Sequence, residues 1–276
     1  MIRKNLIPAW PLILAMVLFF TGPLVLLFGI SLRGPDGSWG FGNFATFLSD
    51  GFSRKVLFDT LWLGLRVTAL VSLVCLPLVM LYWHAGRRMR GLILIGTLLP
   101  MLTSNVVRTF AWVVLLGRNG PIGQSLAGLG LVERPISMLY TEPGLIIALV
   151  QIEMPFLLLP VFAVINRADR ATLDAAETIG AGPWRAWFTT ILPQILPAVL
   201  AGWVLVFAGA TTSYVTQSVI GGARLIFLPQ YVYRQVGVLF QWPMAATISI
   251  LLLASTGLVM LALALLSRNE RLQAHG

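Results

Sequence analysis

The stretch from Leu6 to Leu32 reads LIPAWPLILAMVLFFTGPLVLLFGISL and contains no charged side chain. A helix needs about 20 apolar residues to cross the hydrocarbon core of a bilayer, so this stretch is long enough to span. It is too long for the apolar region of a signal peptide, and no clear cleavage site of small residues follows it. We therefore predict a retained first membrane span at residues 8–32.

Further apolar runs of similar length predict five more spans, at residues 58–83, 91–117, 143–165, 198–220 and 242–266. The predicted fold is an all-α, polytopic membrane bundle of six transmembrane helices. We expect a single domain over residues 1–276, interrupted by one long amphipathic loop at residues 166–197.

The overall composition agrees with a membrane protein, because 58% of the residues are hydrophobic and 11% are charged, whereas soluble domains carry about 25% charged residues. The net charge of +9 would suggest nucleic-acid binding in a soluble protein. In a chain this apolar, loops at an anionic cytoplasmic leaflet explain the basic residues better, so we expect lipids and no nucleic acid as partners. With Cys75 as the single cysteine and two distant histidines, the sequence predicts neither an intrachain disulfide nor a metal site.

The basic residues also predict the orientation of the chain. Arg87, Arg88 and Arg90 share one very short loop between the second and third predicted spans. Loops of this kind stay on the cytoplasmic side of a membrane. This places the N-terminus, with Arg3 and Lys4, in the cytoplasm, and six spans return the C-terminus to the same side.

Several predicted spans are distorted or closely packed. Prolines, which remove a backbone hydrogen bond and kink a helix, lie in or near the spans at Pro77, Pro100, Pro155 and Pro160. Small residues, which let helix backbones approach closely, gather in the fifth span at Ala198, Ala201, Gly202, Ala208, Gly209 and Ala210. Both features suit a bundle that packs and moves, although they also occur in structural membrane proteins.

Three ionisable side chains fall within predicted spans, namely Arg66, Arg108 and Glu153. A charge at mid-membrane costs about 2.5 kcal/mol or more, so such a side chain usually faces a cavity, a partner or the interface. The arginines either snorkel to the interface or line a pathway. Glu153, beside Pro155, is either an interhelical hydrogen-bond or salt-bridge partner or a cavity-facing carboxylate for a cationic substrate.

The end of the fifth predicted span is polar. Hydroxyl and amide side chains interrupt the apolar helix at Thr211, Thr212, Ser213, Thr216, Gln217 and Ser218. Such groups suit either the lining of a passage or hydrogen bonds between helices. We take a set of five residues as candidates for a substrate pathway: Arg108, Glu153, Tyr214, Thr216 and Gln217.

The loop at residues 166–197 predicts two short helices with a glycine hinge, held at the membrane surface. The first helix has an acidic N-terminal turn and ends at Gly180. The second has an apolar face at i, i+3, i+4 and i+7 spacing, formed by Trp184, Trp187, Phe188 and Ile191. An amphipathic helix that only anchors the chain would need neither the hinge nor the Asp174/Glu177 pair.

This loop resembles the EAA loop of ABC importer permeases. The family pattern is Glu-Ala-Ala, three residues, Gly, nine residues and Ile-x-Leu-Pro, and this chain has Asp174-Ala-Ala, Gly180 and Thr190-Ile-Leu-Pro193 at that spacing. Asp174 replaces the glutamate and Thr190 the isoleucine, but the carboxylate is kept. Further stretches between residues 58 and 266 resemble spermidine/putrescine-type permeases: Leu99–Trp112, Pro155-Phe156, Tyr214–Gly222 and Trp242–Ala246.

The resemblance implies a bacterial inner-membrane permease subunit and its partners. A periplasmic substrate-binding protein would deliver solute, two permease subunits, identical or different, would form an alternating-access pathway, and ABC ATPase subunits would bind the loop. The resemblance assigns this coupling contact to Asp174, Ala175, Ala176, Glu177, Gly180 and Pro193. The chain has no G-x-x-x-x-G-K-[ST] phosphate loop, so it would need a separate motor. No cofactor and no catalytic residue are expected.

The sequence does not decide the substrate, and three rival functions fit it less well than a permease. Related permeases serve polyamines, and others serve ferric ion, phosphonates, opines or sulfur oxyanions; Glu153 favours a cation. A secondary transporter is expected to show more embedded acids and, often, internal repeats. An intramembrane enzyme needs a convergent nucleophile–base or metal set, which the sparse histidines do not supply. A purely structural assembly protein would not need the loop at 166–197.

Overall fold

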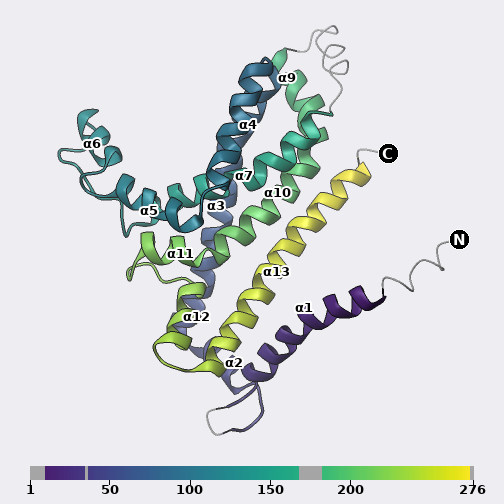
Figure 1. Cartoon of the computed structure of the whole chain (residues 1–276), viewed down its shortest axis with the longest axis vertical. Helices are drawn as coiled ribbons and strands as arrows, with labels where there is room; N and C mark the ends of the chain where they lie inside the picture. Colours follow the sequence, from purple (N-terminus) through teal and green to yellow (C-terminus); the bar gives the residue numbers. More distant parts are fainter. Residues whose placement is uncertain (1–9, 35–36, 168–181, 274–276) are drawn as a thin grey trace, which may run out of the picture. The chain divides into compact units, whose positions relative to one another are not determined.

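The computed structural model describes residues 10–34, 37–167 and 182–273 (Figure 1). In these ranges the regular structure is helical, apart from one isolated antiparallel bridge between Arg33 and Trp39. The helices, in chain order, are α1 (Trp10–Ser31), α2 (Gly42–Ser49), α3 (Gly51–His84), α4 (Arg87–Met101), α5 (Asn105–Leu116), α6 (Pro121–Gly128), α7 (Glu142–Ile165), α9 (Pro183–Ala186), a π-helical segment (Trp187–Ile191), α10 (Leu192–Thr212), α11 (Tyr214–Thr216), a second π-helical segment (Gln217–Gly221), α12 (Leu228–Gly237) and α13 (Trp242–Gln273).

Five helical stretches of the described chain are long and apolar enough to cross a membrane. They are Leu14–Ser31, Gly51–His84, Glu142–Ile165, Trp184–Thr212 and Trp242–Leu265. A bent pair, Arg87–Met101 with Asn105–Gly128, adds a sixth crossing if its two arms count as one span. Each stretch overlaps a predicted span, so the prediction of an all-α, multi-span membrane protein is confirmed.

The third predicted span, 91–117, is a broken helix and not a straight one. α4 ends at Met101, and the arm that begins at Asn105 is bent from it by 101°. At the break, the Thr103 hydroxyl donates to the Pro100 carbonyl at 2.6 Å, and Ser104 has an extended backbone. Proline cannot donate to the helix, and hydroxyl side chains compete for backbone partners, so this short sequence ends α4.

The helix that follows the loop at residues 166–197 also differs from its prediction. From Trp184 to Thr212 the helix is continuous through the first π-helical segment, so the expected short surface helix is the beginning of the fifth span. Trp187 and Ile191 are buried, whereas Trp184 and Phe188 are 65% and 50% exposed. The spacing of these residues defines one face, but tertiary packing decides which part of that face is covered.

Contacts within the chain group it into two compact units. The smaller unit comprises Met1–Leu57 with Leu228–Ala254, and the larger unit comprises Phe58–Phe227 with Ser255–Gly276. The single domain over residues 1–276 stays a prediction. The most apolar windows of α1 and α13 are only 6% and 11% buried, which leaves apolar surface suited to lipid.

In the smaller unit, hydrogen bonds from side chains tie the end of α1 to α2 and α13. The Asn43 amide donates to the carbonyls of Ser31 at 2.9 Å and Arg33 at 2.8 Å, and the Thr247 hydroxyl donates to the Ser31 carbonyl at 3.3 Å. Asp50 caps α3, because the Ser53 hydroxyl and backbone N–H donate to its carboxylate at 2.6 and 2.9 Å. These hydrogen bonds hold the pKa of Asp50 below its usual value.

In the larger unit, α7 and α10 pack closely side by side (Figure 1). A Cβ atom added at Gly202 would lie 2.9 Å from the Leu157 Cα, and one added at Gly209 would meet the carboxyl group of Glu153. Gly64 on α3 lies equally close to the Phe207 ring of α10. The prediction that small residues allow close helix approach is confirmed at Gly202 and Gly209.

Candidate functional site

The five candidate pathway residues lie where α5 and α7 meet the segment that follows α10. Arg108 belongs to α5 and Glu153 to α7, Tyr214 and Thr216 form the ends of α11, and Gln217 begins the second π-helical segment. These elements contact one another. Residues that are 109 positions apart in the sequence are therefore brought into one region, which we call the polar junction.

The polar junction exists because the fifth span breaks at Ser213. α10 ends at Thr212, eight positions before the predicted end of the span, and the backbone then turns at Ser213 (φ −73°, ψ 70°). The Gln217 amide donates to the freed carbonyl of Ala210 at 2.8 Å and to that of Thr211 at 3.4 Å. Because a broken helix in a membrane needs internal partners for its carbonyls, Gln217 makes the break possible.

Hydrogen bonds from side chains connect α5 to its neighbours at the junction. The hydroxyls of Thr109 and Thr216 lie 3.1 Å apart, and both side chains are fully buried. The Trp112 indole donates to the Gln151 amide oxygen on α7 at 3.0 Å. Thr216 and Gln217 are thus enclosed in this arrangement, and their contacts support the helix–helix alternative for both residues.

Glu153 is a buried carboxylate, with 4% of its surface exposed. It lies against Gly209, whose missing side chain leaves room for it. The Arg108 guanidinium is within electrostatic range of Glu153 and donates to the neighbouring Ile152 carbonyl at 3.4 Å. Among the described residues, no ion pair within 4.0 Å reaches Glu153. A buried carboxylate without a direct partner is unusual, since burial of an unpaired charge is costly.

The junction also holds polar atoms that are buried without a hydrogen-bond partner among the described residues. Three of them are acceptors, Asn105 Oδ1, Glu153 Oε2 and Gln217 Oε1, and one is a donor, Arg108 Nε. More than nine-tenths of buried polar groups in proteins are paired, so a cluster of unpaired acceptors needs an explanation. A ligand rich in N–H or O–H donors would supply the missing hydrogen bonds.

Arg66 has a partner that the sequence analysis did not foresee. Its guanidinium forms an ion pair with Glu142 in the first turn of α7 and lies over the Trp62 ring, 5.6 Å from the centroid. The Thr141 hydroxyl caps the same turn by accepting from the Gly144 N–H at 3.3 Å. Arg66 is therefore neutralised at the end of a span and is not a pathway candidate. Thr141 followed by Glu142 was the available signal of a helix N-terminus.

Of the six predicted coupling residues, the structure describes only one. Asp174, Ala175, Ala176, Glu177 and Gly180 lie outside the described residues. The sixth, Pro193, is the second residue of α10 and is exposed. Because helix continues into α10 from the preceding π-helical segment, Pro193 lies within a continuous helix, where its missing N–H removes one backbone hydrogen bond. The role of all six residues stays a prediction.

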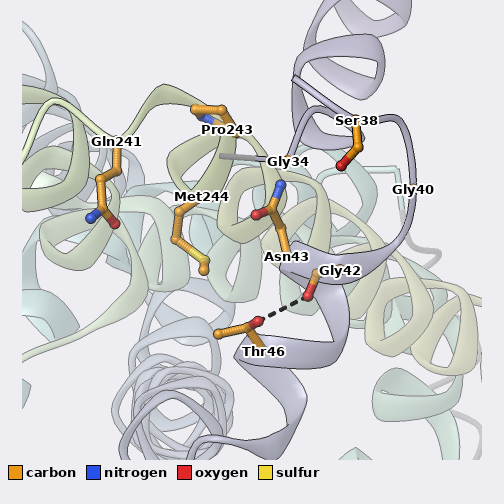
Figure 2. A pocket seen from close by; sticks show the side chains of 9 residues that line it. All are labelled: Gly34, Ser38, Gly40, Gly42, Asn43, Thr46, Gln241, Pro243 and Met244. Carbon is orange, nitrogen blue, oxygen red and sulfur yellow. Dashed lines mark hydrogen bonds between the residues drawn. The ribbon is translucent and has the colours of Figure 1, made fainter. Parts of the chain in front are cut away.

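A cavity of about 390 Å³ lies in the smaller unit, and sequence reasoning missed it (Figure 2). Its lining comes from the chain after α1, from α2 and from the start of α13, namely Gly34, Ser38, Gly40, Gly42, Asn43, Thr46, Gln241, Pro243 and Met244. None of these nine residues carries a charge, so the cavity offers no acid–base chemistry. In the described part of the chain, no group of three or more His, Cys, Asp or Glu residues could hold a metal ion.

A family model described as the binding-protein-dependent transport system inner membrane component matches residues 84–271. The chain belongs to this family. It is a multi-pass inner-membrane permease of an ABC import system, and the family is one of transport proteins and not of enzymes.

Individual relatives and structures agree with this family. The spermidine/putrescine transport system permease protein PotB of Haemophilus influenzae is 28% identical over 244 residues, which cover 85% of this chain and 84% of the relative. A Salmonella typhimurium permease protein whose name assigns it to a 2-aminoethylphosphonate transport system, PhnU, is 29% identical over 82% of this chain and 79% of its own.

Two solved structures share the fold. One is a bacterial ABC transporter involved in the import of the acidic polysaccharide alginate, with a TM-score of 0.74 at 19% identity over 96% of this chain and 98% of that chain. The other is a bacterial alginate ABC transporter in complex with an alginate pentasaccharide-bound periplasmic protein, with a TM-score of 0.72 at 19% identity over 96% and 95% of the two chains. The predicted permease class and fold are therefore confirmed.

The role of Gln217 at the break of the fifth span leads to a stability prediction. Gln217→Leu removes two donors and leaves the buried carbonyls of Ala210 and Thr211 unpaired, which should cost about 1–3 kcal/mol. We expect a lower midpoint of thermal unfolding for the purified protein in detergent. Gln194→Leu is the matched control, because Gln194 is exposed and donates only to the Thr190 carbonyl of its own helix. Equal midpoints for the two variants would contradict the role.

Proposed function

We propose that this chain forms, with a second permease subunit, the membrane pathway for a small cationic solute, and that polyamines are the substrate class. Separate ATPase subunits drive the pathway through the loop at residues 166–197. A periplasmic binding protein delivers the solute, and both chain termini lie in the cytoplasm. The observation that carries the substrate class is Glu153, a buried carboxylate with an unpaired oxygen, in a junction whose elements hold two other unpaired acceptors.

The chemistry of the polar junction supports a polyamine. An alkylammonium group carries a positive charge and several N–H donors, which match the acceptors Glu153 Oε2 and Asn105 Oδ1. A charge-assisted hydrogen bond to a carboxylate is about twice as strong as a neutral one. The similarity to a spermidine/putrescine permease over 85% of this chain supports the same class.

A zwitterionic aminophosphonate is the second candidate, and Arg108 favours it. The Arg108 Nε is a buried donor without a partner among the described residues, and it lies near Glu153. An arginine recognises phosphonate oxygens while a carboxylate recognises an amine. The relative that is named for 2-aminoethylphosphonate transport is 29% identical over a similar share of the chain.

The proposal for the loop rests on its sequence and on the helices at its ends. Asp174, Ala175, Ala176, Glu177, Gly180 and Pro193 form the coupling contact with the ATPase. The described chain on either side belongs to two spans, since α7 ends at Ile165 and α9, which leads into α10, begins at Pro183. Trp187 and Ile191 are buried, so a displacement of this helix start is passed to the packed core. A rigid push on the loop would therefore move α7 and α10.

Two partners follow from the proposed class of transporter. The periplasmic protein in the alginate transporter complex supports a binding protein as the source of solute. The second permease subunit, a copy of this chain or a different one, completes the pathway. The ion-driven secondary transporter is the rival, and it would work without an ATPase.

The coupling contact is tested by Gly180→Trp. A large side chain at the hinge should prevent the loop from seating on the ATPase, so ATPase co-purification and ATP-driven spermidine uptake are both expected to be lost. Gly257→Trp is the control, because a side chain there enters open space on α13. Assembly and uptake at the wild-type level in the Gly180 variant would refute docking at this loop.

The substrate class is tested by Glu153→Gln in the assembled complex. The amide keeps the size of the side chain but removes its charge, and we expect spermidine uptake to fall at least about tenfold, equivalent to about 1.4 kcal/mol, with ATPase association intact. Glu133→Gln serves as the matched control, because Glu133 is exposed. If the Glu153 variant transports spermidine normally, this carboxylate does not serve a polyamine. Preferential uptake of 2-aminoethylphosphonate over spermidine by the wild type would support the second candidate instead.

A further inference from the structure

Tyr82 connects the end of α3 to the residue that leads into the loop at residues 166–197. Its hydroxyl donates to the side-chain oxygen of Asn166 at 3.0 Å, and Asn166 directly follows α7. Its ring stacks on Phe162 of α7, with centroids 4.3 Å apart and an interplanar angle of 26°. Tyr82 is 3% exposed, so the hydroxyl and the ring make these contacts in an enclosed place.

Arg90 of α4 contacts both the backbone and the ring of Tyr82. From α4, its guanidinium donates to the carbonyl of Tyr82 at 3.0 Å and to that of Trp83 at 2.6 Å. The guanidinium carbon also lies 5.3 Å from the centroid of the Tyr82 ring. These carbonyls belong to the last turn of α3, where carbonyls lack intrahelical donors; the Tyr82 carbonyl also accepts from the Ala85 N–H at 3.3 Å. Arg90 therefore closes the helix end and fixes the ring that reaches Asn166.

The returning side of the loop rests on the same group of buried residues. Ala186, Trp187 and Ile191 belong to one apolar cluster together with Tyr82 and Phe162. All five are at most 3% exposed. The segment Trp187–Ile191 is π-helical, and such turns within α-helices often occur at functional sites. The helix ends on both sides of the loop thus belong to the same apolar core.

We propose that Tyr82 is a positioning residue for energy coupling. Through its hydrogen bond to Asn166, and with Arg90 behind it, Tyr82 makes α3 and α4 follow the movement of the loop, in addition to α7 and α10. A loop held only by its two flanking spans could move without the α3–α4 pair. This inference rests on the proposed role of the loop as the ATPase docking site.

Tyr82→Phe separates positioning from packing, because it removes the hydroxyl and keeps the ring. The experiment uses the full complex in proteoliposomes, with its ATPase and binding protein, and measures ATP hydrolysed and spermidine transported. We expect the number of molecules transported per ATP to fall about fivefold, with ATP hydrolysis retained. Tyr231→Phe is the matched control, since the Tyr231 hydroxyl lies 3.2 Å from the Ser53 hydroxyl, and both residues belong to the smaller unit.

A double-mutant comparison identifies the bond responsible. Asn166→Ala should lower the same ratio. In the Tyr82→Phe/Asn166→Ala double variant, the ratio should be no lower than in the single variant with the lower ratio. A purely structural role would lower the unfolding midpoint and the yield of complex while the ratio stayed constant, and this outcome would overturn the inference. If the wild-type permease does not bind the ATPase at all, the proposed function of the loop is overturned instead, so the two failures are distinguishable.

Discussion

Hydrocarbon offers no hydrogen-bond partner to the peptide backbone, and this constraint explains most features of the molecule. Long helices satisfy it by pairing every N–H and C=O within the span. Where a helix breaks, a side chain has to replace the missing partner. The Thr103 hydroxyl joins its own N–H in donating to the Pro100 carbonyl at the bend between α4 and α5, and the Gln217 amide donates to the Ala210 carbonyl where α10 ends. The two breaks belong to elements that meet at the polar junction, so irregular backbone and polar side chains are found together.

The same constraint connects the junction to transport. A polar cluster in a membrane protein is stable when every polar group in it has a hydrogen-bond partner. Groups without a partner are retained at functional sites, where they contact a substrate or an ion. Here the unpaired oxygens of Asn105, Glu153 and Gln217 are acceptors, and the carboxyl group of Glu153 packs against Gly209 of α10. At the Ile165 end of α7, Tyr82, Phe162 and Asn166 tie the span to α3. α7 therefore joins the proposed solute contact to the proposed site of energy input.

The sequence predicted the spans well because hydropathy is a local property that a run of side chains carries by itself. It predicted the gathering of Arg108, Glu153 and Thr216 only as a candidate set, since their proximity depends on the packing of α5, α7 and α11. The break within 91–117 was signalled by Pro100 and the hydroxyl residues Thr103 and Ser104, but a continuous apolar pattern concealed it. The Arg66–Glu142 pair joins residues 76 positions apart, and the cavity near Asn43 depends on a loop conformation, so neither could be read from a linear pattern. The coupling contact at Asp174 and Gly180 stays a prediction from sequence.

An ABC import permease differs from a secondary transporter in that its transport requires a separate ATPase. The measurement is uptake of radiolabelled spermidine into proteoliposomes that contain this chain and its partner permease, with and without the ATPase subunits, in the presence of enclosed ATP and external binding protein. We expect uptake only when the ATPase is present, and we expect it to be unchanged by ionophores that dissipate ion gradients. Uptake without the ATPase that is abolished by ionophores would contradict this expectation and would identify a secondary transporter.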